Sequence, residues 1–205
     1  MTIRVGIFLF DEAEALDFAG PYEVFTTASR VALRHPRQQS QELPRTLFSV
    51  VSVAEHADLV KLRAGMRVLP DVTFAVATAF DVLIVPGGVV SQEMQKPAVI
   101  QWISHIAAHT QITASVCTGA FLLAKAGVLT DHTVTTHWED ISDLRLQFPD
   151  LDVQNNVRWV DQGKIVTSAG ISAGIDMSLH LVERLAGREL AIATARQMEF
   201  EWQQT

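Results

Sequence analysis

Short apolar runs alternate with amphipathic stretches along this chain, and the alternation predicts strands separated by helices. Strands are expected where apolar and β-branched residues dominate, at 3–10, 46–54, 82–85 and 112–116. Helices are expected where apolar residues recur with helical spacing, at 97–109, 120–126, 139–147, 175–185 and 188–201. A further helix follows the first strand, with Pro21 in its first turn and Val24, Phe25 and Ala28 on its inner face.

The chain between these elements carries weaker patterns. Residues 31–45 are polar and basic and contain two prolines, which favours a surface loop. Residues 59–69 fit a hairpin or two short strands, 72–79 fit a strand or a short helix, and 134–138 form a β-rich stretch. Residues 157–167 hold an Asp-Gln-Gly-Lys turn between apolar runs and predict a hairpin, followed by a small-residue loop at 168–174.

Strands that alternate with helices imply an α/β fold, in which helices cover both faces of a mostly parallel sheet. A length of 205 residues predicts one domain spanning 1–205. We find no internal repeat, low-complexity tract or linker in the sequence.

Composition limits the possible functions. The chain is 48% hydrophobic and 19% charged with a formal net charge of −7, and no basic stripe is available to neutralise phosphates, so nucleic-acid binding is not expected. No apolar run reaches the roughly 18 residues of a membrane span, and the N-terminus lacks a signal-peptide pattern. One cysteine excludes an internal disulfide. We therefore expect a cytoplasmic protein without membrane contact.

The most informative stretch is 111–127, QITASVCTGAFLLAKAG. It predicts a buried strand, a sharp turn at Cys117-Thr118-Gly119 and a helix, which is the arrangement of a nucleophile elbow with a thiol. Free N–H groups at a helix N-terminus favour thiolate over thiol, so we expect Cys117 to be deprotonated near neutral pH and readily oxidised. The alternative is that Cys117 is a small buried hydrophobe.

Two other segments also follow predicted strands. Asp17 lies just beyond the first strand, where it is either an N-cap or a proton donor and acceptor. Gly87 and Gly88 follow the strand at 82–85, where they form an ordinary turn or let a ligand approach main-chain N–H groups. Because ligands bind beyond the carboxyl ends of parallel strands, we expect both segments to converge with Cys117, the N–H groups of Thr118 and Gly88 forming an anion hole.

Histidines add two weaker signals. His105 and His109 are spaced i, i+4, but no HExxH pattern or third ligand accompanies them, so no metal site is expected. His137 follows a β-rich stretch next to Trp138, a position that is more typical of a structural hydrogen-bonding role than of a catalytic base.

Several motifs resemble those of the DJ-1/PfpI superfamily. They are LDxxGPxEVF at 16–25, DVLIVPGG at 81–88, SVCTGAFLLAKAG at 115–127, TTHW at 135–138 and SAGISAGID at 168–176. Residues 129–132 depart from the usual Asp-Gly-like turn before TTHW, in a loop. The resemblance covers about residues 3–199 and is closest to the isocyanide hydratase branch and to the sensor-like domains of AraC-type regulators.

The resemblance implies a flavodoxin-like three-layer sandwich, similar to class I glutamine amidotransferases, and a homodimer. It implies a reactive Cys117, an acidic partner at Asp17 and an oxyanion-side loop at Gly87-Gly88. Peptidase and amidotransferase relatives place a histidine directly after the nucleophile, where this chain has Thr118, so a hydratase acting on a small-molecule substrate without a cofactor is expected instead.

Two other functions stay open at this point. One is a non-catalytic ligand-sensing domain, which would need a partner to bind DNA because no helix-turn-helix segment precedes Thr205. The other is a redox or stress-response protein that uses oxidation of Cys117.

Overall fold

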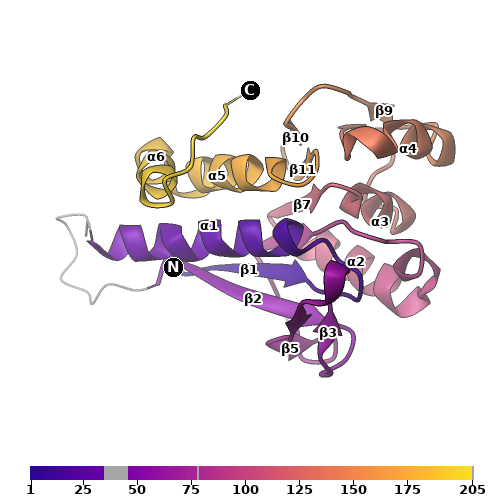
Figure 1. Ribbon diagram of the computed structural model, residues 1–205, viewed down its shortest axis with the longest axis horizontal. Helices are drawn as coiled ribbons and strands as arrows, with labels where there is room; N and C mark the ends of the chain where they lie inside the picture. Colours follow the sequence, from indigo (N-terminus) through magenta and orange to yellow (C-terminus); the bar gives the residue numbers. More distant parts are fainter. Residues whose placement is uncertain (35–45, 78, 205) are drawn as a thin grey trace.

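The structure is a computed structural model that describes residues 1–34, 46–77 and 79–204 (Figure 1). Its main sheet contains seven strands: β1 (Ile3–Phe8), β2 (Phe48–Ala54), β5 (Val72–Thr73), β6 (Val82–Val85), β7 (Ile112–Val116), β10 (Trp159–Gln162) and β11 (Ile165–Ser168). The α-helices are α1 (Ala15–Arg34), α2 (Pro97–His109), α3 (Gly119–Lys125), α4 (Ile141–Gln147), α5 (Ala173–Ala186) and α6 (Arg188–Gln197).

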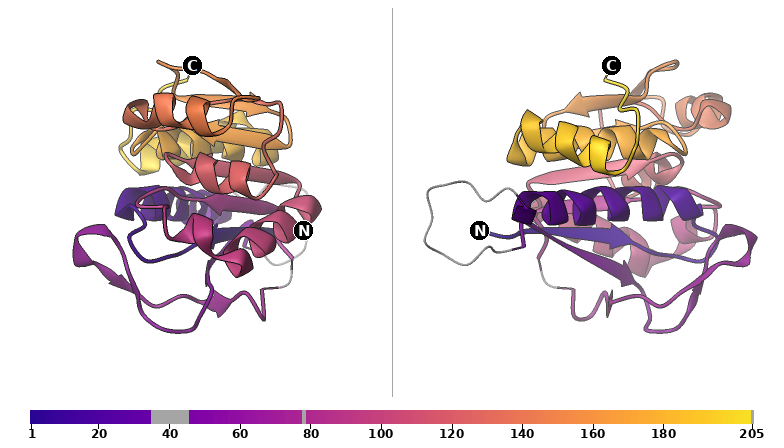
Figure 2. Two further views of the ribbon diagram at one scale, coloured as in Figure 1. Left: turned by 90° about the vertical axis from the view of Figure 1, so that its right-hand side faces the viewer. Right: turned by 60° about the vertical axis from the view of Figure 1, so that its left-hand side comes forward.

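The strand order of the main sheet is β10-β11-β7-β6-β1-β2-β5, and every pairing is parallel except that of β10 with β11. All four residues of β6 and all five of β7 are buried, as expected for central strands covered on both faces. Helices α1, α5 and α6 contact one another on one side of the sheet, whereas α2 and α3 contact each other on the opposite side (Figure 2). The predicted α/β, flavodoxin-like three-layer fold is confirmed.

The strand order also fixes where a ligand site is expected. The chain runs from β1 to β2 on one side and then returns to place β6 on the other side of β1. The switch point between β1 and β6 leaves a crevice beyond their carboxyl ends. Asp17 and Gly87 follow these two strands, and Cys117 follows the adjacent β7.

Helix α1 differs from its prediction at both ends. It begins at Ala15, so Pro21 lies inside the helix and not in its first turn. Asp17 is in that first turn and its own N–H donates to the Glu14 carbonyl at 3.1 Å, so the N-cap interpretation of Asp17 is wrong. The helix continues to Arg34, into the expected 31–45 loop, and the rest of that prediction lies outside the described residues.

The irregular segments were predicted with mixed success. The hairpins are confirmed by the antiparallel pairs β3 (Val60–Lys61) with β4 (Arg67–Val68) and β10 with β11. The 139–147 helix begins as a 3₁₀ turn at Trp138–Asp140 before α4. The sequence did not reveal β9 (Asp152–Val153), which pairs in parallel with β8 (Thr133–Val134), because two-residue strands carry no periodicity.

Candidate active site

Cys117 occupies a strained elbow between β7 and α3. Its φ of 56° lies in the left-handed region, which non-glycine residues rarely adopt and which costs about 1–3 kcal/mol when tertiary packing enforces it. The backbone around Cys117 is packed tightly enough to enforce it. The chain has no room for a side chain at two neighbouring glycines, because a Cβ on Gly119 would collide with the Val85 carbonyl oxygen and a Cβ on Gly87 would lie 2.9 Å from Cys117 Cβ. The predicted strand-turn-helix at Cys117 is therefore present, held against the end of β6.

Thr118 ties the elbow to the Gly87-Gly88 turn. The Gly88 N–H donates to Thr118 Oγ1 at 2.9 Å, and the Thr118 hydroxyl lies 2.9 Å from the Gly88 carbonyl. The Gly88 N–H thus already has an acceptor in this arrangement, and its part in an anion hole stays a prediction. Burial raises the pKa of the Cys117 thiol, and the Thr118 amide and hydroxyl offset a part of that rise because they favour the charged form.

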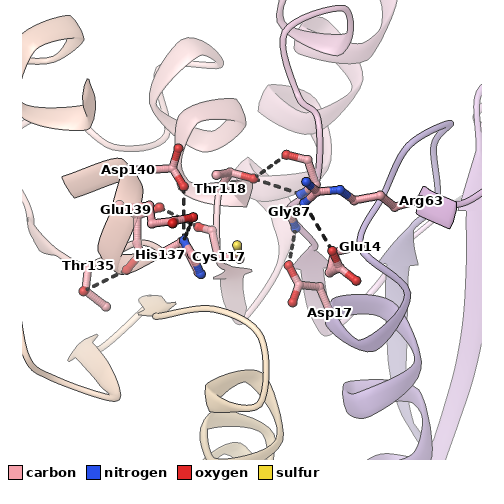
Figure 3. A network of polar contacts seen from close by, with 12 residues as sticks. Glu14, Asp17, Arg63, Gly87, Cys117, Thr118, Thr135, His137, Glu139 and Asp140 are labelled. Carbon is pink, nitrogen blue, oxygen red and sulfur yellow. Dashed lines mark hydrogen bonds and ion pairs between the residues drawn. The ribbon is translucent and has the colours of Figure 1, made fainter. Parts of the chain in front are cut away.

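Asp17 lies on the inner side of Cys117 and is fully buried, with 0% of its surface exposed. Its Oδ2 accepts a hydrogen bond from the Gly87 N–H at 3.1 Å, while its Oδ1 is buried without a hydrogen-bond partner (Figure 3). Asp17, Gly87 and Cys117 thus meet at one edge of the sheet, as the sequence predicted.

Burial dominates the proton affinities of the pair. It raises the pKa of Asp17 from 3.8 to about 7, more than the Gly87 amide and the Cys117 thiol lower it. Burial and the nearby Asp17 charge also raise the pKa of the Cys117 thiol. Both effects disfavour the thiolate that the elbow position predicts, so a thiolate near neutral pH stays a prediction for titration to test. Helix α3 has only seven residues, and its first N–H groups do not overcome these two effects.

A cavity of about 630 Å³ opens on the outer side of Cys117. Apolar side chains line part of it, among them Val90, Met94, Phe121 and Ile171. Carboxylates line another part, from Glu14, Glu139, Asp140 and Asp143, and Arg63 forms an ion pair with Glu14 at 3.3 Å. The cavity is thus large enough to hold a small molecule beside Cys117.

Two residues at the sulfur were not among the predicted site residues. A Cβ on Gly170 would lie 2.9 Å from Cys117 Sγ and would collide with Cδ2 of His137. His137 also lines the cavity, and Figure 3 shows the sulfur between His137 and Asp17. The sequence contains no signal for Gly170, which is one of several small residues in a loop. The connection from β11 to α5 brings it beside the Cys117 elbow.

The described residues contain no helix that is both long and apolar enough to span a bilayer. Within the same ranges, no group of three or more histidine, cysteine, aspartate or glutamate side chains is placed to hold a metal ion. The centroids of the His105 and His109 rings lie 4.9 Å apart, and Nδ1 of His109 lies 2.8 Å from the His105 carbonyl oxygen.

Fold and site together define an α/β protein with a cysteine at a nucleophile elbow, beside a buried aspartate. The family model described as DJ-1/PfpI family matches residues 3–184, and the chain belongs to that family. An isonitrile hydratase of Pseudomonas putida is 31% identical over 201 residues, which cover 98% of this chain and 79% of the relative. A ThiJ/PfpI family protein from Pseudomonas syringae has the same fold, with a TM-score of 0.84 at 21% identity over 100% of this chain and 77% of its own.

Regulators are also among the relatives. The HTH-type transcriptional regulator GbdR of Pseudomonas aeruginosa is 29% identical over 178 residues, which cover 86% of this chain and 48% of the regulator. The chain therefore spans about half the length of that relative. Both branches named by the sequence resemblance are thus represented among the relatives.

Proposed function

We propose that this protein is a cysteine-dependent hydratase that converts isocyanides, R–N≡C, to N-formamides. The observation that supports it best is the buried pair of Cys117 and Asp17, in which the carboxyl has its pKa raised to about 7 and can both take and give a proton at neutral pH. The isonitrile hydratase relative adds support for the substrate class.

The first half-reaction joins the thiol to the substrate. Asp17 removes the proton of the Cys117 thiol as sulfur attacks the terminal carbon of the isocyanide, and a C–S bond forms. Asp17 then passes that proton to the same carbon, which gives the thioimidate R–N=CH–S–Cys117. A protonated resting thiol suits this step, because the nucleophile is generated only as the proton moves to Asp17.

The second half-reaction adds water. The water oxygen bonds to the thioimidate carbon, and one of its protons ends on the nitrogen. The carbinol R–NH–CH(OH)–S–Cys117 then loses its hydroxyl proton to Asp17, the C–S bond breaks and the formamide leaves. Asp17 returns its proton to the sulfur, so the site is reset without a cofactor.

A turnover assay tests this function. Purified protein is incubated with a series of small alkyl and aryl isocyanides, and the N-formamide is measured by chromatography. We expect turnover by the unmodified protein and none by Cys117→Ala, because that variant lacks the nucleophile. Equal formamide production by both proteins, or by neither, would contradict the proposal.

A ligand-sensing function is the second candidate, supported by the similarity to GbdR. Saturable binding of a small molecule in the cavity, without any isocyanide turnover, would favour this function over the hydratase.

We also propose a homodimer, on the basis of the family and of the frequency of two-fold symmetric pairs. Sedimentation equilibrium that finds only the 22.6 kDa monomer at micromolar concentration would exclude the dimer.

A further inference from the structure

His137 borders the same sulfur as Asp17 but from the cavity side. Its ring and Cys117 Sγ both lie against Gly170, whose missing side chain leaves room for the two groups. About 17% of the His137 side chain is exposed, whereas Asp17 is completely buried. Water that enters through the cavity therefore meets His137 before it can approach Asp17.

The ring of His137 is oriented by a carboxylate. Nδ1 lies 3.4 Å from Asp140 Oδ2 and 3.9 Å from Glu139 Oε2 (Figure 3). This leaves Nε2 on the opposite side of the ring, and among the described residues it has no hydrogen-bond partner. A nucleophile, an imidazole and an orienting carboxylate around one cavity are the parts needed to activate water.

We propose that His137 is the residue that activates water in the second half-reaction, a role that rests on the proposed hydratase function. Nε2 accepts a proton from water while the water oxygen bonds to the thioimidate carbon and the C=N electron pair moves to nitrogen. His137 then gives the same proton to that nitrogen. Asp140 holds Nδ1 and stabilises the imidazolium during the step. Asp17 and His137 thus serve the two half-reactions from opposite sides of the sulfur.

Covalent adducts separate this role from a structural one. Intact-mass spectrometry after mixing with a small alkyl isocyanide follows the thioimidate on Cys117, while chromatography follows the formamide. In His137→Ala we expect the adduct to form at the normal rate and to break down at least about 100-fold more slowly, so that it accumulates. His132→Ala is the matched control: His132 precedes β8 in the same connection and does not line the cavity, so adduct breakdown is expected at the normal rate.

Chemical rescue provides a second readout that a structural role would not give. Added imidazole should speed adduct breakdown in His137→Ala, because the small base can enter the space left by the ring. Asp140→Asn should also slow breakdown, by a smaller factor than His137→Ala.

Each contrary result has a distinct meaning. A folded His137→Ala protein that releases formamide at the rate of the unmodified protein would overturn the role of His137 alone. An unmodified protein that forms neither adduct nor formamide would overturn the hydratase function and this role with it.

Discussion

Asp17 and Asp140 lie on opposite sides of the same cysteine, and their surroundings differ. Asp17 is fully buried, with one amide donor and one oxygen that has no partner. Asp140 has 34% of its side chain exposed and lies beside His137. Burial is the largest cause that raises the pKa of both carboxyls, and in Asp140 the nearby His137 offsets part of that rise. The comparison indicates that deeper burial brings the pKa of a carboxyl group closer to neutral pH.

The largest expected effect is on turnover. Asp17→Asn keeps the size of the side chain and an acceptor for the Gly87 N–H but cannot carry a proton. Isocyanide hydration should therefore fall by about 10²–10⁴-fold, while Asp140→Asn should lose less. Initial rates of formamide production, measured on variants shown to be folded by circular dichroism, test this order. Near-normal turnover by Asp17→Asn would contradict the proton-carrying role.

The second effect is on stability as a function of pH. The pKa of Asp17 is raised from 3.8 to about 7 in the folded state, so between these values the folded protein binds more protons than the unfolded chain. The free energy of unfolding should then decrease as pH rises through this window, by at most about 4 kcal/mol from this group. In Asp17→Asn this decrease should be absent, so the variant gains stability relative to the unmodified protein as pH rises.

Urea unfolding between about pH 4 and about pH 8 measures this difference. Asp140→Asn is the matched control, and its pH dependence should stay close to that of the unmodified protein because solvent screens its partly exposed carboxylate. Parallel curves for the unmodified protein and Asp17→Asn would show that Asp17 has an ordinary pKa.

The third effect is on the thiol. Burial is the largest cause that raises the pKa of Cys117, and the charge of Asp17 is the second. Ultraviolet absorbance of the thiolate is followed against pH. In the unmodified protein the thiolate should form at a pH above the ordinary pKa of a cysteine, and in Asp17→Asn it should form at a lower pH than in the unmodified protein. Cys117→Ala provides the baseline. A thiolate already present at neutral pH in the unmodified protein would confirm the expectation drawn from the elbow position instead.

The smallest effect is expected at Glu14. Burial is the largest influence on the pKa of Asp17, and the negative charge of Glu14, which also raises that pKa, is the smallest. Arg63 partly neutralises the charge of Glu14. Glu14→Gln should move the acidic limb of the pH–rate profile slightly toward lower pH without a large loss of maximal turnover. A loss as large as that of Asp17→Asn would indicate that Glu14 contacts the substrate directly.

The sequence by itself determined the architecture and the centre of the site. Apolar periodicity gave the strands and helices, and the turn at Cys117 together with the rule for parallel sheets brought Asp17 and Gly87-Gly88 to the same edge. These features depend on local patterns of a few residues, which the chain carries in full. The extent of 1–205 as one domain and the cytoplasmic location stay predictions.

Tertiary structure decided the pKa values of the site residues and the contacts between them. Burial of each group raises the pKa of Asp17 and of Cys117. The Thr118 hydroxyl oxygen accepts the hydrogen bond of the Gly88 N–H, and Gly170 leaves room for His137 beside the sulfur. None of these follows from local pattern. Desolvation depends on every segment that packs around a group, and a contact between distant loops depends on how the whole sheet is covered.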